Sequence, residues 1–185
     1  APSRCPMRLR LPVPWCPPSA VTLGSMPTLV LVRHAQAAYS YPDHSRPLTR
    51  VGVDQAARLG GVLSREIGAF DVAVCSDVTR AQQTFAQVSQ RVSIRESWFD
   101  RGVYNADEED ILTLARTFEG CNALIVGHEP TISGAGYVLA RENDRGEVAR
   151  GVPTATALIL TFDGTWENLT PSSCTLRAVL TPPTR

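Results

Sequence analysis

Three short apolar runs, each followed by a segment with helical periodicity, constrain the fold of this chain more than any other feature. The runs cover residues 28–33, 71–76 and 122–128. Continuous apolar runs of this length are typical of strands that are buried on both faces, as in a parallel sheet. Strands that alternate with helices predict an α/β protein, a three-layer sandwich in which helices flank a mostly parallel, mixed sheet.

The helical segments begin after residues that can cap a helix. A Thr or Asp side chain at this position accepts a hydrogen bond from a free backbone N–H of the first turn. The expected caps and helices are Thr49 before 50–68, Asp77 before 78–90 and Asp107 before 108–118. A further helix is expected over 130–140, with Pro130 in its first turn.

The pattern changes near the C-terminus. Residues 154–169 predict two strands around an Asp163-Gly164 turn, because Asp-Gly between apolar runs is a strong hairpin signal. Residues 174–180 are expected to form a last edge strand. The hairpin makes the predicted sheet mixed.

The N-terminal end has a different composition from the rest. Residues 1–25 contain six prolines and three arginines but no acidic residue, so they cannot form a regular helix. We therefore expect a disordered Pro/Arg-rich extension over 1–26 and a single domain over 27–185.

Composition excludes several classes of protein. The 18 basic residues equal the 18 acidic ones, whereas a nucleic-acid or membrane-surface binder shows a basic excess. No apolar run reaches the ~18 residues that span a bilayer. The five cysteines are odd in number, widely spaced and without a C-x-x-C pair, which argues against a disulfide framework or a zinc site. These features favour a reducing, cytoplasmic setting.

Cationic and imidazole side chains follow the three apolar runs. Arg33 and His34 end the first run, Arg80 lies shortly after the second, and His128 ends the third. The carboxyl ends of parallel strands meet at one edge of a sheet, where ligands bind in open α/β folds. The sequence therefore predicts an anion pocket that contains a nucleophile.

Each of these residues also has a simpler interpretation. A cation in a first helical turn is disfavoured by ~0.3–1 kcal/mol, which a bound anion would reverse. Without an anion, Arg80 would extend to solvent or pair with Asp77. A single histidine after a strand is often a polar core residue, but His34 has His128 at a matching position. His44 lies in a polar loop and is expected to be solvated.

Other catalytic motifs are absent from the sequence. The acidic run Asp107–Asp110 suits the first turn of a helix and requires no metal ion. The chain contains no H-x-x-x-H, EF-hand loop or P-loop pattern, and no G-x-S-x-G of a serine hydrolase.

Four blocks of sequence, in order, resemble the histidine phosphatase superfamily, and its short SixA-type phosphohistidine phosphatases in particular. The blocks are VRHAQA, RPLTRVGVDQAARLGGVL, SDVTRAQQT and IVGHEPT. The resemblance covers Met26 to about Leu180 and implies a phosphoglycerate-mutase-like fold. The common Arg-His-Gly of the family is Arg33-His34-Ala35 here, and a small residue is expected to be tolerated there.

The resemblance implies a role for each matching residue. His34 would be the nucleophile that takes the phosphoryl group on nitrogen. Arg33 and Arg80 would bind the phosphoryl oxygens, and His128 would donate to them. The backbone N–H of Glu129 would assist, and neighbouring cations would keep His34 neutral. No cofactor and no metal ion are implied.

The general acid is not fixed by the resemblance. Larger family members place an acidic residue after the third strand, and three residues here are candidates: Glu96, Asp100 and Glu129. We take Asp100 as the expected one. This region contains no long insertion, so a shallow, open site is expected.

The leading hypothesis is a metal-independent phosphatase that works through phosphorylated His34 on phosphohistidine in proteins. One alternative is a small-molecule phosphomonoesterase acting on a sugar phosphate or nucleotide. The other is a non-catalytic phosphate-binding module. The expected partner is thus a phosphorylated protein or a small phosphate ester, with no nucleic acid or membrane, and no oligomeric state is predicted.

Overall fold

The computed structural model describes residues 26–183 of the 185-residue chain. Their strands form a six-stranded mixed sheet in the order β3-β2-β4-β1-β5-β6. The strands are β1 (Thr28–Arg33), β2 (Ala69–Ser76), β3 (Ser93–Asp100), β4 (Asn122–Gly127), β5 (Ala157–Thr161) and β6 (Thr175–Leu180). The first four run parallel, β5 pairs antiparallel with β1, and β6 pairs antiparallel with β5, so β5 alone runs against the other strands of the sheet. The predicted 1–26 extension lies outside the described residues except for Met26.

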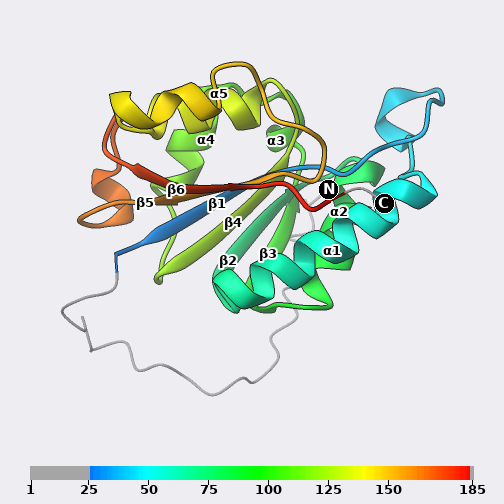
Figure 1. Cartoon of the computed structure of the whole chain (residues 1–185), viewed down its shortest axis with the longest axis horizontal. Coiled ribbons are helices and arrows are strands. Elements are labelled where there is room, and N and C mark those ends of the chain that lie inside the picture. Colours follow the sequence, from blue (N-terminus) through cyan, green and yellow to red (C-terminus); the bar gives the residue numbers. More distant parts are fainter. Residues whose placement is uncertain (1–25, 184–185) are drawn as a thin grey trace, which may run out of the picture.

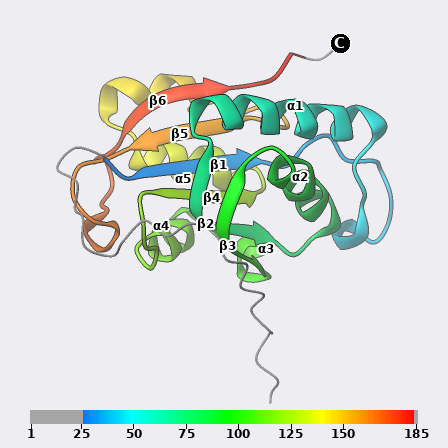
Figure 2. The ribbon, with the colours of Figure 1, turned by 90° about the horizontal axis from the view of Figure 1, so that it is seen from below.

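Helices cover both faces of this sheet (Figure 1). They are α1 (Arg50–Glu66), α2 (Thr79–Ser89), α3 (Gly102–Asn105), α4 (Glu108–Ala115) and α5 (Thr131–Leu139), with short 3-10 helices η1 (Asp43–Ser45), η2 (Glu142–Glu147) and η3 (Trp166–Asn168). Figure 2 shows α1 and α2 on one face, and α3, α4 and α5 lie on the other. The three-layer α/β prediction is confirmed.

The core is divided into two halves by the sheet. Alternate residues of β1 enter different clusters: Leu29 and Leu31 pack on the α4–α5 side, Val30 and Val32 on the α1–α2 side. All four are fully buried. Burial on both faces explains why β1 reads as a continuous apolar run rather than an alternating one. No helix among residues 26–183 is both long and apolar enough to cross a membrane.

Two of the three predicted helix caps are confirmed. The Thr49 side chain accepts a hydrogen bond from the Gly52 N–H, and Asp107 forms a capping box with Asp110. The prediction that Asp77 caps the second helix was wrong, because α2 begins at Thr79 without a side-chain cap. The carboxylate of Asp77 pairs instead with His44, in a loop that sequence periodicity does not place.

The prediction of a hairpin around Asp163-Gly164 was also wrong, because its second strand does not form. Gly164 has a positive φ of 108° and does form a turn, but the chain then enters η3 rather than a strand. Trp166 is the reason: its ring is buried, and its indole N–H donates to the Gly120 carbonyl at 2.7 Å. Besides β1, the antiparallel partner of β5 is β6, which is the last edge strand as predicted.

Candidate active site

The three strand ends named by the sequence meet at one edge of the sheet. β1 lies beside β4, and β4 lies beside β2, all parallel. Arg33 is in register with Gly127, so His34 and His128 follow their strands side by side. The centroids of the two imidazole rings are 5.1 Å apart. The predicted convergence of these histidines is confirmed.

The hydrogen bonds of His34 determine which of its nitrogens is free. Nδ1 lies 2.7 Å from the Ala35 carbonyl, which can only accept, so Nδ1 carries the proton. Nε2 then accepts from Nε of Arg80 at 3.3 Å and bears the lone pair. The Ala35 N–H donates to the Thr84 hydroxyl, which fixes this turn against α2. The arrangement presents Nε2 as a nucleophile.

The pKa of His34 is lowered to about 4. Burial is the largest cause, and the positive charges of Arg80, Arg33 and Arg46 add to it, while the bond to the Ala35 carbonyl opposes it. The sequence predicted a neutral ring because of the arginines. The ring is neutral at pH 7, and the largest single cause is desolvation rather than any one of the arginine charges.

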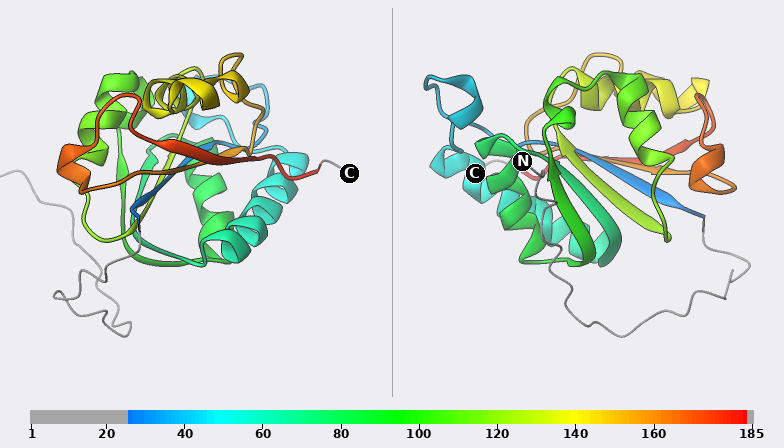
Figure 3. Two further views of the ribbon diagram at one scale, coloured as in Figure 1. Left: turned by 60° about the vertical axis from the view of Figure 1, so that its left-hand side comes forward. Right: turned by 180° about the vertical axis from the view of Figure 1, so that it is seen from behind.

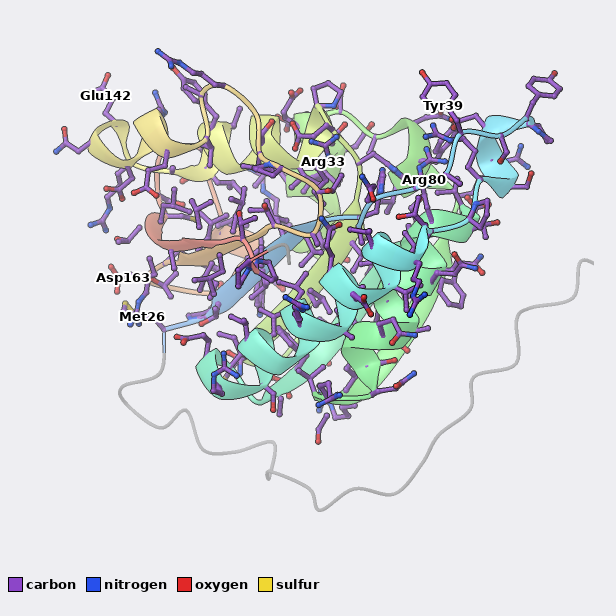
Figure 4. The ribbon with its side chains drawn as sticks, turned by 45° about the vertical axis from the view of Figure 1, so that its right-hand side comes forward. Met26, Arg33, Tyr39, Arg80, Glu142 and Asp163 are labelled. Carbon is purple, nitrogen blue, oxygen red and sulfur yellow. The ribbon has the colours of Figure 1, made fainter. Side chains whose placement is uncertain are left out.

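Arg80 is buried, with 6% of its surface exposed, and it is held by Asp43. Its Nη1 donates to the Asp43 backbone carbonyl at 2.8 Å and its Nη2 to the carboxylate at 3.0 Å. The interpretations that Arg80 extends to solvent or pairs with Asp77 were therefore wrong. Arg80, labelled in Figure 4, reaches His34 from the first turn of α2.

Asp43 is the main residue of this edge that the sequence did not indicate. Besides Arg80, its carboxylate accepts from the Tyr104 hydroxyl and from Nη1 of Arg46, each at 2.9 Å. Hydrogen bonds from Arg46 and Tyr104, followed by the charge of Arg80, lower its pKa to about 2. Asp43 therefore stays ionised. It begins the three-residue helix η1 after Pro42, which is too short to show periodicity, so no local pattern could have predicted the contact.

Arg33 is held differently from Arg80. Its Nη1 donates to the backbone carbonyl of Val152, in the segment between η2 and β5. Its Nε is buried and has no hydrogen-bond partner among the described residues. A buried N–H without a partner is costly, so an unpaired guanidinium nitrogen at this edge suggests a site for an anionic acceptor.

The second unpaired nitrogen of the site belongs to His128. Its Nε2 lies 2.8 Å from the Ser76 hydroxyl at the end of β2, whereas its buried Nδ1 has no partner in residues 26–183. Burial is the largest cause that lowers its pKa to about 3, and electrostatic repulsion from the neighbouring His34 ring when it is protonated, and from Arg80, adds to it. The Tyr104 ring packs edge-on against His128 with centroids 5.5 Å apart. Ser76 and Tyr104 thus complete the walls of the site, and neither was predicted.

The acidic candidates are placed at different distances from this edge. Glu96 is in register with Val72, four residues before the end of β2, which is roughly 13 Å along the strand. Asp100 is in register with Ser76 at the edge itself, where its carboxylate accepts from the Gly102 N–H at 2.7 Å. The Glu129 carboxylate accepts from the Ser133 N–H at 3.2 Å and from its hydroxyl. Asp100 remains the predicted general acid.

His44 is not free in solvent, although it takes no part in the contacts of His34. Its ring is exposed as expected, but Nε2 lies 3.0 Å from the Asp77 carboxylate and the ring packs edge-on against Tyr104. Farther away, the acidic run after Ala106 caps α4. Among the described residues, no group of three or more His, Cys, Asp or Glu side chains is arranged to hold a metal ion.

The fold and the site together define a phosphoglycerate-mutase-like α/β protein with two neutral histidines and two arginines at the carboxyl edge of its sheet. The family model of the histidine phosphatase superfamily (branch 1) matches residues 29–101. This chain belongs to that superfamily. The match includes Arg33, His34, Asp43 and Arg80.

Relatives and solved structures extend the likeness over the rest of the chain. A protein of Mycobacterium tuberculosis (strain ATCC 25618 / H37Rv), named as uncharacterized, is 30% identical over 154 residues, which cover 78% of this chain and 96% of the relative. A candidate phosphohistidine phosphatase SixA from Nakamurella multipartitia is 31% identical, with a TM-score of 0.76 over 84% of this chain and 96% of the other. The protein histidine phosphatase SixA complexed with tungstate shares the fold at 20% identity, with a TM-score of 0.68 over 84% and 97%.

Proposed function

We propose that this chain is a metal-independent phosphatase that hydrolyses phosphohistidine in proteins through a phosphohistidine intermediate on Nε2 of His34. The observation that carries the proposal is the pair of buried, unpaired nitrogens, Nε of Arg33 and Nδ1 of His128, on the same edge as the lone pair of His34. An anion between them would satisfy both nitrogens. A phosphoryl group has three such acceptor oxygens.

The first step forms an N–P bond and breaks the bond from phosphorus to the leaving atom. The lone pair of His34 Nε2 attacks phosphorus, and the Arg80 Nε–H that now points to Nε2 turns to a phosphoryl oxygen. The electron pair of the broken bond stays on the leaving nitrogen or oxygen, which takes a proton. Phosphoryl transfer depends mainly on positioning and charge neutralisation, which the two guanidiniums supply.

The second step hydrolyses the intermediate. Water attacks phosphorus, the bond to Nε2 breaks, and the electron pair returns to the ring while a proton is released. The Nδ1–H bond to the Ala35 carbonyl keeps the ring oriented through both steps. We assign the proton donor of the first step to Asp100, which ends β3 beside Ser76.

A protein substrate is favoured by the family likeness and by the leaving group. The relative that shows the fold with tungstate is named a protein histidine phosphatase, and the Nakamurella relative carries a similar name. The imidazole of phosphohistidine is a good leaving group and needs less help from an acid than an alkoxide does. We also propose that the protein acts in the cytoplasm, as the number and spacing of its cysteines led us to expect.

Turnover in the presence of EDTA tests the proposal. The substrates are phosphoramidate, a phosphohistidine peptide and p-nitrophenyl phosphate, and the variants are His34→Ala and, as a matched histidine control, His44→Ala. We expect the P–N bond to be cleaved preferentially, with activity lost in His34→Ala and largely kept in the control. Preference for the ester would instead indicate a small-molecule phosphatase. Phosphate binding without turnover of any substrate would indicate a binding module.

A further inference from the structure

The loop between β1 and α1 carries two tyrosines that are exposed to solvent. The side chains of Tyr39 and Tyr41 are 102% and 96% exposed, the highest values among the large hydrophobic residues of the described chain. The loop stands out from the body of the protein beside the carboxyl edge of the sheet (Figure 3, right). Tyrosine is enriched in protein interfaces because it offers a large contact area with few rotatable bonds.

This loop is held in a fixed shape by hydrogen bonds between its own residues. The Ala38 N–H donates to the Pro47 carbonyl at 2.8 Å, and Nε of Arg46 donates back to the Ala38 carbonyl at 2.8 Å. An isolated bridge joins Ala37 and Leu48 at its base. A pre-ordered loop loses little conformational entropy when a partner binds, so its exposed side chains are suited to recognition.

The loop is also connected to the candidate active site. The guanidinium of Arg46 lies over the Tyr39 ring, 5.3 Å from its centroid, and Nη1 of Arg46 binds the Asp43 carboxylate. Asp43 in turn holds Arg80, which contacts His34. Figure 4 shows Tyr39 above Arg80 on the same side of the molecule. An occupant of the site that is larger than a phosphate group would extend toward this loop.

We infer that Tyr39 and Tyr41 form the docking surface for the folded protein that carries the phosphoryl group. The inference rests on the proposed function, because it specifies how a phosphoprotein would be recognised. A side chain that is fully exposed cannot line the pocket of His34, so a small phosphate ester held there would gain little from the tyrosines. A protein surface that brings a phosphohistidine to Nε2 can cover both rings.

The test compares a small and a large substrate. The small one is phosphoramidate, and the large one is a folded carrier protein whose surface histidine has been phosphorylated with phosphoramidate. The variants are the double substitution Tyr39→Ala/Tyr41→Ala and the control Tyr137→Ala. Tyr137 is a matched tyrosine because it is 42% exposed and also lies under a guanidinium, that of Arg145, at 5.1 Å.

The expected result separates KM from kcat. In the double variant, KM for the phosphorylated protein rises about tenfold or more, as when a contact residue of an interface is truncated. Its kcat stays close to the native value, since binding is lost equally in the ground and transition states. Turnover of phosphoramidate stays within about twofold, which also shows that the variant is folded. The control leaves both substrates unaffected.

Other outcomes overturn the inference in distinguishable ways. If the double variant loses equal activity on both substrates, the tyrosines have a structural role. If it loses activity on neither substrate, they have no role in docking. If only Tyr137→Ala loses activity on the phosphorylated protein, docking is assigned to the groove of about 510 Å³ that Tyr137 lines beside Glu129. A native dimer that dissociates in the double variant would assign the tyrosines to a second copy of the chain. If the native enzyme cleaves phosphoramidate but not the phosphoprotein, the docking surface is ruled out while the phosphatase activity stands. If it cleaves neither substrate, the proposed function is overturned as well.

Discussion

The two arginines of the candidate site reach the same edge of the sheet but are held by different partners. Arg80 is bound through both terminal nitrogens to Asp43, and its Nε donates to His34. Arg33 is bound through one nitrogen to the neutral backbone carbonyl of Val152, and its buried Nε has no partner among residues 26–183. One guanidinium is thus balanced by a carboxylate before any ligand binds, and the other is not.

This difference assigns separate tasks to two chemically identical groups. The Asp43 carboxylate fixes the fork of Arg80 and offsets part of its charge beside a buried imidazole, so Arg80 is preorganised. Arg33 keeps an open donor and an unbalanced charge, which a phosphoryl oxygen can satisfy. Under the proposed function, a site built in this way would attract an anion through Arg33 and position the nucleophile through Arg80.

Removing each arginine in turn gives the largest expected effects. Arg80→Ala should lower kcat/KM for phosphoramidate by about 10³-fold, because it removes an oxyanion donor together with the contact to His34. Arg33→Ala should lower it by about 10²-fold, since only the oxyanion donor is lost. Steady-state kinetics of both variants measures the two ratios.

Arg116→Ala is the matched control for this pair. Nε of Arg116 also donates to a backbone carbonyl, that of Leu169, but at the opposite end of α4 from the site. Its activity should match that of the native chain. Equal losses in Arg33→Ala and Arg80→Ala would show that the two arginines have the same task and would contradict the comparison.

The pH dependence of His34 provides a second test. With its pKa lowered to about 4, the ring stays neutral as the pH falls through 6.5 and becomes protonated only near pH 4, where Nε2 loses its lone pair. An NMR titration of the imidazole resonances measures this pKa directly. In Arg33→Gln and Arg80→Gln the pKa should rise but stay well below 6.5, because burial is the larger cause. If the pKa of His34 returned to 6.5 in these variants, the arginine charges rather than burial would be the main cause of its lowering.

The same shift predicts the direction of a stability change. Between pH 6.5 and about 4 the unfolded chain binds a proton at His34 that the folded chain does not, so the free energy of unfolding falls as the pH is lowered through this range. His128, with a pKa of about 3, acts in the same direction. Denaturant titrations of the native chain and of His128→Gln at pH 7 and pH 5 test this, and the native chain should lose more stability.

Of the two arginines of the site, Asp43→Asn affects only Arg80, whose guanidinium the carboxylate binds. The amide keeps the shape and one acceptor oxygen but removes the charge-assisted bonds to Arg80 and Arg46. We expect kcat to fall about tenfold with KM little changed, because a mispositioned donor is felt mainly in the transition state. Glu109→Gln, on the exposed face of α4, is the control. A rise in KM at constant kcat would instead show that Asp43 acts in substrate binding.

The residues of the site divide into those that sequence could indicate and those that it could not. Arg33, His34 and His128 each adjoin a buried apolar run, so strand topology alone brings them together. Asp43 and Tyr104 come from a three-residue 3-10 helix and a four-residue helix, which are too short to carry a periodic signal. Their meeting at 2.9 Å is set by how both segments pack over the sheet edge, which is a tertiary property.

The fold shows the same division. Caps such as Thr49 were predictable because a cap is a contact between residues three positions apart. The strand expected after Gly164 was not formed, because Trp166 packs against the ring of Phe162 and against the ring of Phe118, which is far from it in the sequence. Burial of a large aromatic side chain outweighed the local preference for a hairpin.

Among the substitutions considered, Tyr104→Phe should have the smallest effect on activity. It removes one neutral hydrogen bond to Asp43 and keeps the ring that packs edge-on against His128. Because Arg46 and Arg80 still hold the carboxylate, we expect kcat to fall only about two- to fivefold, in line with the ~0.5–1 kcal/mol of a single hydrogen bond. Tyr137→Phe is the control, and both are measured on phosphoramidate. A loss as large as that of Arg80→Ala would place the Tyr104 hydroxyl on the substrate itself rather than behind Asp43.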